Sequence, residues 1–259
     1  MEPRIGCAAF HREVLDGRVD GRTLGEANRE RFEVPKGPDQ TLFAQRVTAM
    51  GSDVILWGVG TSRTMRAHWM LLELGVDYRF HAIGSRTGET QSGEFLRLNP
   101  RHKIPVLQHG SLVLTESAAI IEYLSATFPS PQIYRPSNPE SFAALSEWCY
   151  FILSELDAAS LYMVRRHQGL KHIYGEAPVA VQAAKTYFSH NLEAMAPRIG
   201  TASPYLFGTR LSTADILLMT CLEWALAEKV SLPESVMRYR ERVAGRLAYQ
   251  TALARNFAQ

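Results

Sequence analysis

The spacing of apolar residues divides this chain of 259 residues into three parts. Residues 1–52 carry many charges and little sustained periodicity, so we expect a poorly structured N-terminal extension there. Residues 53–129 alternate short apolar runs with helical patterns, whereas residues 140–259 show helical periodicity alone. A proline-rich linker, residues 130–139, joins the two. We therefore predict two folded domains, and we expect removal of residues 1–49 to leave folding and ligand binding intact.

The first folded part has the order β-α-β-α-β-β-α. Short connections and right-handed crossovers turn such an order into a small mixed sheet with helices on both faces. The last two strands are expected to form a hairpin about the turn QHGS, residues 108–111. The expected strands are residues 54–57, 78–83, 104–107 and 112–115. The expected helices are residues 61–75 and 117–128, and the polar stretch 84–97 is expected to hold a loop and a short irregular helix.

The second folded part shows no convincing strand. Amphipathic patterns predict four or five helices, the last of them broken near Gly245. The expected spans are residues 140–167, 178–198, 212–229 and 235–257. The fold class is therefore an α/β N-terminal domain followed by an all-α C-terminal domain.

Composition and charge narrow the function classes. Hydrophobic residues make up 46% of the chain and charged residues 21%, which is typical of a globular protein. The net charge of +2 gives no field that favours nucleic acid, and no apolar run approaches the ~18 residues of a membrane span. The three cysteines (Cys7, Cys149 and Cys221) and the eight histidines show no metal-binding spacing, so we expect no metal and a reduced, cytoplasmic setting.

The first candidate site feature is a proline inside an apolar run. Pro105 removes a hydrogen-bond donor from the predicted strand, so it belongs at an edge or a special turn. If the Ile104–Pro105 bond is cis, the amide and carbonyl of Ile104 face outward and can pair with an extended peptide. Only about 5–6% of X–Pro bonds are cis, so an ordinary trans proline is the alternative.

The second feature is Glu116-Ser117, where the hairpin turns into a helix. Unpaired N–H groups and the positive end of the helix dipole favour a bound carboxylate there, with the Ser117 hydroxyl as a further donor. Glu116 beside it would accept hydrogen bonds from an ammonium group. Together the pair suits the α-carboxylate and α-amino groups of an amino acid, and plain helix capping is the alternative.

Three segments together resemble the cytosolic glutathione S-transferases, in particular a serine-type, theta-like bacterial branch. They are GTSRTMRAHWMLLELG (60–75), EFLRLNPRHKIPVLQHGSLVLTESAAIIEYL (94–124) and LSTADILLMTCLEWA (211–225). The resemblance implies a thioredoxin-like domain followed by an all-helical domain, glutathione as co-substrate, a homodimer, and a detoxifying role.

The resemblance also assigns the glutathione contacts. It implies that Ile104, before a cis Pro105, pairs with the cysteinyl backbone of glutathione, and that Glu116 and Ser117 hold the γ-glutamyl end. Lys103 matches a lysine that contacts the glycyl carboxylate in similar proteins, with His102 as a substitute. Thr90 and Gln91 lie where the loop after the second strand reaches the same end. The alternative for Lys103, Thr90 and Gln91 is a solvated loop residue.

The catalytic group must hold the glutathione sulfur as its thiolate. Thr61 and Ser62 supply hydroxyls at the first strand-to-helix turn, which contains no Cys and no Tyr. An ungapped match to the serine-type families puts the activating hydroxyl at Val59, which cannot donate. We therefore expect Ser62 to be catalytic, with Thr61 second. The alternatives are activation by backbone N–H groups, or that both residues are only N-caps.

Five further polar residues are assigned either to the second substrate or to the protein surface. Tyr162, Arg165 and Arg166 could contact the second substrate, or form an ordinary solvated face. Arg63 and Arg66 are expected to be surface or interface charges with acidic partners nearby.

Ser212 and Asp215 form a capping-box variant, which matches the buried N-capping box of the helical domain in these transferases. We interpret this pair as structural and expect replacement of either residue by Ala to cost about 1–2 kcal/mol of stability.

The leading functional hypothesis is a glutathione S-transferase that activates the glutathione thiol for attack on a small electrophile, by alkyl or aryl transfer. One alternative is a non-catalytic binding or scaffold protein that keeps the fold, for which Val59 at the expected hydroxyl position is the best support. A glutathione-dependent reductase or peroxidase is the other. Neither nucleic acid nor membrane is an expected partner.

Overall fold

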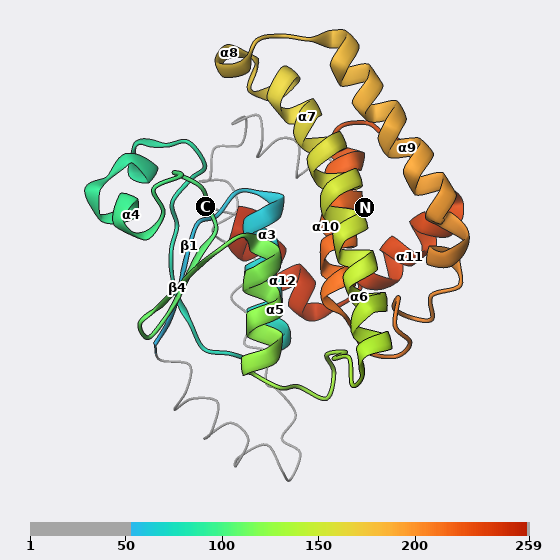
Figure 1. Cartoon of the computed structure of the whole chain (residues 1–259), viewed down its shortest axis with the longest axis horizontal. Helices are drawn as coiled ribbons and strands as arrows, with labels where there is room; N and C mark the ends of the chain where they lie inside the picture. Colours follow the sequence, from blue (N-terminus) through green and yellow to red (C-terminus); the bar gives the residue numbers. More distant parts are fainter. Residues whose placement is uncertain (1–52, 258–259) are drawn as a thin grey trace, which may run out of the picture. The chain divides into compact units, whose positions relative to one another are not determined.

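The computed structural model describes residues 53–257, shown in colour in Figure 1. The expected N-terminal extension, residues 1–52, lies outside the described residues. The described chain divides into two compact units. One consists of residues 53–120 together with residues 251–257, and the other of residues 121–250. The end of the chain therefore folds with the first unit.

The first unit is built on a mixed four-stranded sheet with the strand order β2-β1-β3-β4. Strand β1 runs parallel to β2 and antiparallel to β3, and β3 forms a hairpin with β4. This confirms the predicted mixed sheet and hairpin, but the strand expected at residues 104–107 lies two residues later. The turn is Gly110-Ser111 rather than residues 108–111, because Gln108 and His109 pair with Val113 and Leu112. The elements are β1 (Val54–Trp57), α3 (Ser62–Glu73), β2 (Arg79–His81), η1 (Gly88–Gln91), α4 (Gly93–Leu98), β3 (Val106–His109), β4 (Leu112–Thr115) and α5 (Ser117–Thr127).

Strand β2 is shorter than the expected span 78–83. It ends at His81 because the Ile83 N–H turns back to the His81 carbonyl at 2.9 Å. The Ile83 carbonyl then accepts the Val59 N–H at 3.0 Å. The segment after β2 is thus tied to the segment after β1 rather than extending the ladder.

Side chains on the two faces of the sheet are buried under different elements. Val54 and Leu56 alternate with Ile55 and Trp57 along β1, as a strand covered on both faces requires. Trp57 packs in one core cluster with Ile83, Phe95, Ile104 and Val106. That cluster joins the sheet to α4, while α3 lies on the opposite face (Figure 1).

The second unit is helical. Its elements are the end of α5, then α6 (Pro139–Phe151), the π-helical segment η2 (Ile152–Leu161), α7 (Tyr162–Val164), the π-helical segment η3 (Arg165–Gly169), α8 (Lys171–Tyr174), α9 (Pro178–Gly200), α10 (Thr213–Ala227), α11 (Glu234–Ala244) and the start of α12 (Leu247–Phe257). From α6 to η3 the helix is unbroken, close to the predicted span 140–167. The predicted break near Gly245 is also confirmed, because α11 ends at Ala244 and α12 begins at Leu247.

Helix α10 forms the centre of the second unit. Every residue from Thr213 to Ala225 is buried. A helix buried on all sides needs neighbours all round, and η2, α6 and α11 pack against α10, while α9 packs against η2 and α11. No helix among residues 53–257 combines the length and apolar character that a membrane crossing requires.

The predicted capping box begins α10. The Ser212 hydroxyl accepts the Asp215 N–H at 3.2 Å, and the Asp215 carboxylate accepts the Ser212 N–H at 2.8 Å. The same carboxylate also accepts the Leu206 N–H at 2.9 Å and the Tyr239 hydroxyl at 2.6 Å. Asp215 therefore fastens the start of α10 both to the loop before it and to α11.

Candidate functional site

The strand register brings the candidate residues to one edge of the sheet. Val106, the first residue of β3, pairs with Trp57 at the end of β1 and with Thr115 at the end of β4. The segments Ile104–Pro105, Gly58–Ser62 and Glu116–Ser117 continue directly from these three paired positions. They are far apart in sequence, and the sheet gathers them at one edge.

Ile104 presents an open backbone at this edge. The Ile104–Pro105 peptide bond is cis. Among hydrogen bonds between described residues, none uses the N–H or the carbonyl of Ile104. The Asn99 side-chain amide holds the preceding carbonyl, that of Lys103, at 2.8 Å. An extended peptide could therefore pair with Ile104 without displacing a bond within the protein.

Gly58 makes the close approach between β1 and this segment possible. Its φ of +116° lies in a region that favours glycine. A Cβ at this position would lie 2.6 Å from the Ile104 Cβ. A side chain at residue 58 would therefore push the Ile104 backbone away from the end of β1.

The strand-to-helix turn places Thr61 and Ser62 at the start of α3. Thr61 is the N-cap: its hydroxyl accepts the Thr64 N–H at 3.0 Å and lies 3.0 Å from the Thr64 hydroxyl. Ser62 is the first residue of the helix, is 8% exposed, and its hydroxyl has no hydrogen-bond partner within the described part of the chain. The Thr61 hydroxyl is thus engaged in capping, whereas that of Ser62 is available to a ligand.

Val59, the position that an ungapped family match favours for the activating hydroxyl, has a structural role. Its side chain is buried, and its N–H bonds to the Ile83 carbonyl at 3.0 Å.

The region around Ser62 favours an anion. The N-terminus of α3 carries the positive end of the helix dipole, and its first turn contains no acidic residue. Arg66 follows Ser62 by four positions, so the two residues lie on the same face of α3. A thiol bound beside Ser62 would lose its proton more readily in such surroundings.

Arg66 connects this turn to the start of α5. Its side chain is almost completely buried, and Nη1 donates to the Ser117 hydroxyl at 3.1 Å. The expectation of a surface or interface charge was therefore wrong for Arg66. A cation near the N-terminus of a helix is unfavourable for the helix dipole, which led to the expectation of an acidic partner. The Arg66 side chain instead reaches Ser117, 51 positions later in the sequence. Arg66 consequently joins the first turns of α3 to Ser117 at the start of α5.

Glu116 ends the hairpin in a strained conformation. Its φ is +67°, a value that residues other than glycine rarely adopt. The Glu116 carbonyl accepts the Ile120 N–H at 3.0 Å, which is the first helical bond of α5. Backbone strain of this kind tends to gather at ligand-binding sites, where surrounding structure holds it.

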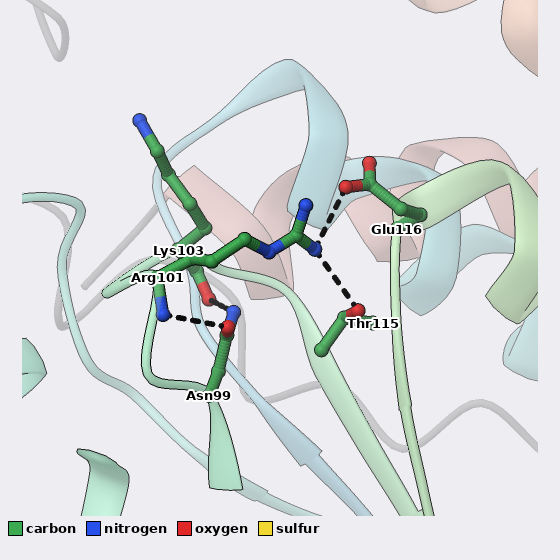
Figure 2. Close-up of polar contacts among 5 residues, drawn as sticks. All are labelled: Asn99, Arg101, Lys103, Thr115 and Glu116. Carbon is green, nitrogen blue, oxygen red and sulfur yellow. Dashed lines mark hydrogen bonds and ion pairs between the residues drawn. The ribbon is translucent and has the colours of Figure 1, made fainter.

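Arg101 pairs with Glu116, as Figure 2 shows. Its Nη2 lies 2.9 Å from the Glu116 carboxylate and donates to the Thr115 hydroxyl at 3.1 Å. Both charged side chains are more than half exposed, so the pair stabilises the fold by at most about 1 kcal/mol. Arg101 is not identifiable as a site residue from the sequence, because its partner is known only once β3 and β4 are paired.

The remaining predicted glutathione contacts differ in exposure. The Lys103 side chain is exposed and extends away from the Arg101–Glu116 pair (Figure 2). Gln91 is exposed at the end of η1. Thr90 is fully buried, and its hydroxyl donates to the Thr87 carbonyl at 2.9 Å.

The residues proposed for the second substrate lie in the second unit. Tyr162 begins α7, and Arg165 and Arg166 begin η3. All three are half-buried. The Arg166 guanidinium lies over the Tyr174 ring at 4.6 Å, and its Nε is buried without a hydrogen-bond partner among the described residues.

His68 packs behind the turn. The Gly58 carbonyl lies 3.1 Å from its Nε2, and the Tyr78 hydroxyl lies 2.7 Å from its Nδ1. Burial lowers the pKa of His68 to about 4, so the ring is neutral at pH 7. Elsewhere in residues 53–257, no three His, Cys, Asp or Glu side chains gather as metal ligands.

Comparison with known proteins agrees with this geometry. The family model described as "Glutathione S-transferase, N-terminal domain" matches residues 52–126. The chain is 28% identical to the glutathione S-transferase GstA of Escherichia coli O157:H7 over 199 residues, covering 74% of this chain and 92% of that protein. It is 27% identical to a probable maleylacetoacetate isomerase of Vibrio cholerae serotype O1, covering 76% of this chain and 91% of that protein.

A solved structure gives the same result over both units. The glutathione-bound theta-class glutathione S-transferase of Xanthomonas axonopodis pv. citri aligns with a TM-score of 0.66 and 27% identity, covering 78% of this chain and 97% of that chain. The chain is therefore similar to glutathione S-transferases over both units, and residues 52–126 match the model of their N-terminal domain.

Proposed function

We propose that this protein is a glutathione transferase in which Ser62 activates the glutathione thiol for attack on a small electrophile. The observation that carries the proposal is the convergence at one sheet edge of an open Ile104 backbone, the Ser62 hydroxyl and the start of α5. These three features match the three needs of the tripeptide: a backbone partner, a thiol partner and an anchor for its γ-glutamyl end.

Glutathione binds along this edge. Its cysteinyl residue pairs with the N–H and carbonyl of Ile104. Its γ-glutamyl carboxylate meets the Ser117 hydroxyl and the N-terminus of α5, where the buried Arg66 adds positive charge. Glu116 accepts hydrogen bonds from the γ-glutamyl ammonium, which then shares this carboxylate with Arg101. Lys103 supplies a cation for the glycyl carboxylate.

Ser62 acts by donating its hydroxyl to the glutathione sulfur, which stabilises the thiolate. A hydrogen bond to a charged group contributes about 1.5–3 kcal/mol, which corresponds to a thiol pKa lower by about 1–2 pH units. The thiolate then attacks the electrophile, and the leaving group departs as the carbon–sulfur bond forms. Holding both reactants together supplies further rate by proximity.

The finer assignments follow from the similarity to glutathione S-transferases and are part of the proposal. They comprise alkyl or aryl transfer, a theta-like branch, a two-fold homodimer, a cytoplasmic location, and contact of Tyr162, Arg165 and Arg166 with the electrophile. Sedimentation of the purified chain tests the dimer, and turnover of a panel of alkyl and aryl halides tests the chemistry.

The decisive experiment compares Ser62→Ala with the wild type. Ultraviolet absorbance of the bound thiolate, followed against pH, gives the thiol pKa, and calorimetry with S-methylglutathione gives affinity without the thiol. We expect Ser62→Ala to raise the thiol pKa by about 1–2 pH units and to leave the thioether affinity within about threefold. Ser111→Ala, an exposed serine in the β3–β4 turn, is the matched control. An unchanged thiol pKa in Ser62→Ala would refute the assignment.

A non-catalytic scaffold is the alternative. Glutathione binding without turnover of any aryl or alkyl halide would favour it. Because one relative is named a probable maleylacetoacetate isomerase, the same panel should include maleylacetoacetate.

A further inference from the structure

We propose that Asn256, near the end of the chain, is a positioning residue that holds the turn carrying Ser62. The catalytic part of this inference depends on the proposed role of Ser62. Residues 251–257 fold with the first unit, so the last turns of α12 and the turn between β1 and α3 belong to one compact body.

Asn256 contacts the turn on both sides of Ser62. Its backbone carbonyl accepts the Gly60 N–H at 2.8 Å. Its side-chain Nδ2 donates to the Thr61 carbonyl at 3.1 Å, and its Oδ1 accepts the Thr64 hydroxyl at 2.7 Å. The residue is only 1% exposed. Three hydrogen bonds from one buried residue therefore fix the chain before and after Ser62.

The side chain and the main chain of Asn256 make different hydrogen bonds, so a substitution can remove one set and keep the other. Replacement by Ala leaves the bond from Gly60 to the backbone carbonyl, so the end of α12 can stay docked. The lost bonds are those to the Thr61 carbonyl and the Thr64 hydroxyl, which set where α3 begins. The Thr64 hydroxyl also lies 2.8 Å from the Thr61 carbonyl, so its one proton would settle on that bond. The first turn of α3, with Ser62 in it, would gain freedom.

The neighbouring residue supports the same turn from its other end. The Arg255 guanidinium lies 5.2 Å from the centre of the Tyr78 ring. Tyr78 contacts His68, which contacts the Gly58 carbonyl. Residues 255 and 256 thus anchor both limits of the segment from Gly58 to Thr64. Such anchoring matters for catalysis because a misplacement of about 1 Å can cost about 100-fold in rate.

The test uses the full chain and the variants Asn256→Ala and Asn256→Asp. Asp keeps an oxygen for the Thr64 hydroxyl but cannot donate to the Thr61 carbonyl, so it preserves most of the buried contact. Ala254→Gln is the control, because residue 254 lies on the exposed face of the same helix. Native-state hydrogen exchange of the amides from Gly60 to Met65 measures the turn without any ligand. The pKa of the bound glutathione thiol and the affinity for S-methylglutathione measure the site.

We expect Asn256→Ala to speed exchange of the Gly60–Met65 amides about tenfold, equivalent to one lost hydrogen bond, with no change in α10. The thiol pKa should rise by about 0.5–1 pH unit, while the S-methylglutathione affinity stays within about threefold. Asn256→Asp should also speed amide exchange and raise the thiol pKa. If the Ala variant does not fold, the Asp variant serves as the test of whether Asn256 positions Ser62.

Unchanged exchange and thiol pKa in both variants would overturn the inference. A loss of S-methylglutathione affinity that equals, as a fold-change, the loss in thiol ionisation would also overturn it. Asn256 would then support the whole first unit rather than the position of Ser62. A failure of the proposed function is distinguishable: Ser62→Ala would leave the thiol pKa unchanged, while the ligand-free exchange would still show whether Asn256 holds the turn.

Discussion

Replacement of Asp215 should reveal how much of the second unit depends on one carboxylate. The sequence pattern alone predicts a cost of about 1–2 kcal/mol for the loss of this cap. The structure raises that expectation, because the buried carboxylate accepts four hydrogen bonds: two from Ser212, one from the Leu206 N–H and one from the Tyr239 hydroxyl.

The magnitude follows from the donors that Asp215→Ala leaves behind. The Tyr239 hydroxyl and the Ser212 N–H are fully buried, and each unpaired buried donor costs about 1–3 kcal/mol. Burial and the adjacent carboxylate raise the pKa of Tyr239 well above its ordinary value, so the phenol remains a donor. We expect Asp215→Ala to lower the free energy of unfolding by about 4 kcal/mol, against about 1–2 kcal/mol for Ser212→Ala.

Urea unfolding of the full chain, followed by far-ultraviolet circular dichroism, measures both losses. Tyr239→Phe removes a single donor and leaves Asp215 three others, so it should cost about 1 kcal/mol. The double variant Asp215→Ala/Tyr239→Phe should be more stable than the sum of the single losses predicts, since the unpaired phenol is gone. If Asp215→Ala costs no more than Ser212→Ala, the bonds to Leu206 and Tyr239 contribute nothing and the reasoning fails.

Three further predictions concern buried groups near and away from the site. The pKa of His68 is about 4 in the folded chain and near 6.5 in the unfolded chain. The free energy of unfolding should therefore be highest above pH 6.5 and fall by about 3 kcal/mol towards pH 4. Urea titrations at several pH values should show this fall, and His68→Gln should lack the part that is due to His68. Gly58→Ala should lower the free energy of unfolding by more than about 2 kcal/mol, because the added Cβ would clash with Ile104. Gly60→Ala, with no atom near the added Cβ, should lower it by about 1 kcal/mol. Equal losses would argue against the contact between residue 58 and Ile104. Burial raises the pKa of Cys149 to about 12, so iodoacetamide at pH 8 should spare it in the folded chain and modify it in urea, and rapid modification of the native thiol, detected by mass spectrometry, would contradict its burial.

Several features that depend only on residues close together in the sequence were predicted correctly. Helix caps involve residues three positions apart, so Ser212 and Asp215 were readable as a capping box, and Thr61 as a helix start. The hairpin and the break near Gly245 depend on turn-forming residues that stand in the sequence. These features need no knowledge of tertiary contacts.

Contacts between distant residues were not predictable in the same way. Arg66 looked like a surface charge because its partner, Ser117, follows 51 residues later. Asn256 meets Thr64 across 192 positions, and nothing in the pattern of α12 marks it. Residue spacing likewise left the state of the Ile104–Pro105 bond open, and the structure shows it to be cis. The sequence named most candidate site residues, but only the fold shows which of them are connected.

Of the four described non-glycine residues with positive φ, His102 and Glu116 lie at the sheet edge that carries these residues, and Arg86 and Lys229 lie elsewhere. Gly58 at φ +116°, His102 at φ +57° and Glu116 at φ +67° all lie in segments that continue from or lead into paired strand ends there. Ile104 leaves its backbone groups unpaired at the same edge. Away from this edge the buried carboxylate of Asp215 is fully matched, whereas among the described residues Arg166 Nε and Glu223 Oε2 are buried without a hydrogen bond. Backbone strain and unpaired backbone groups that meet at the ends of three paired strands therefore support the proposal that this edge binds a ligand.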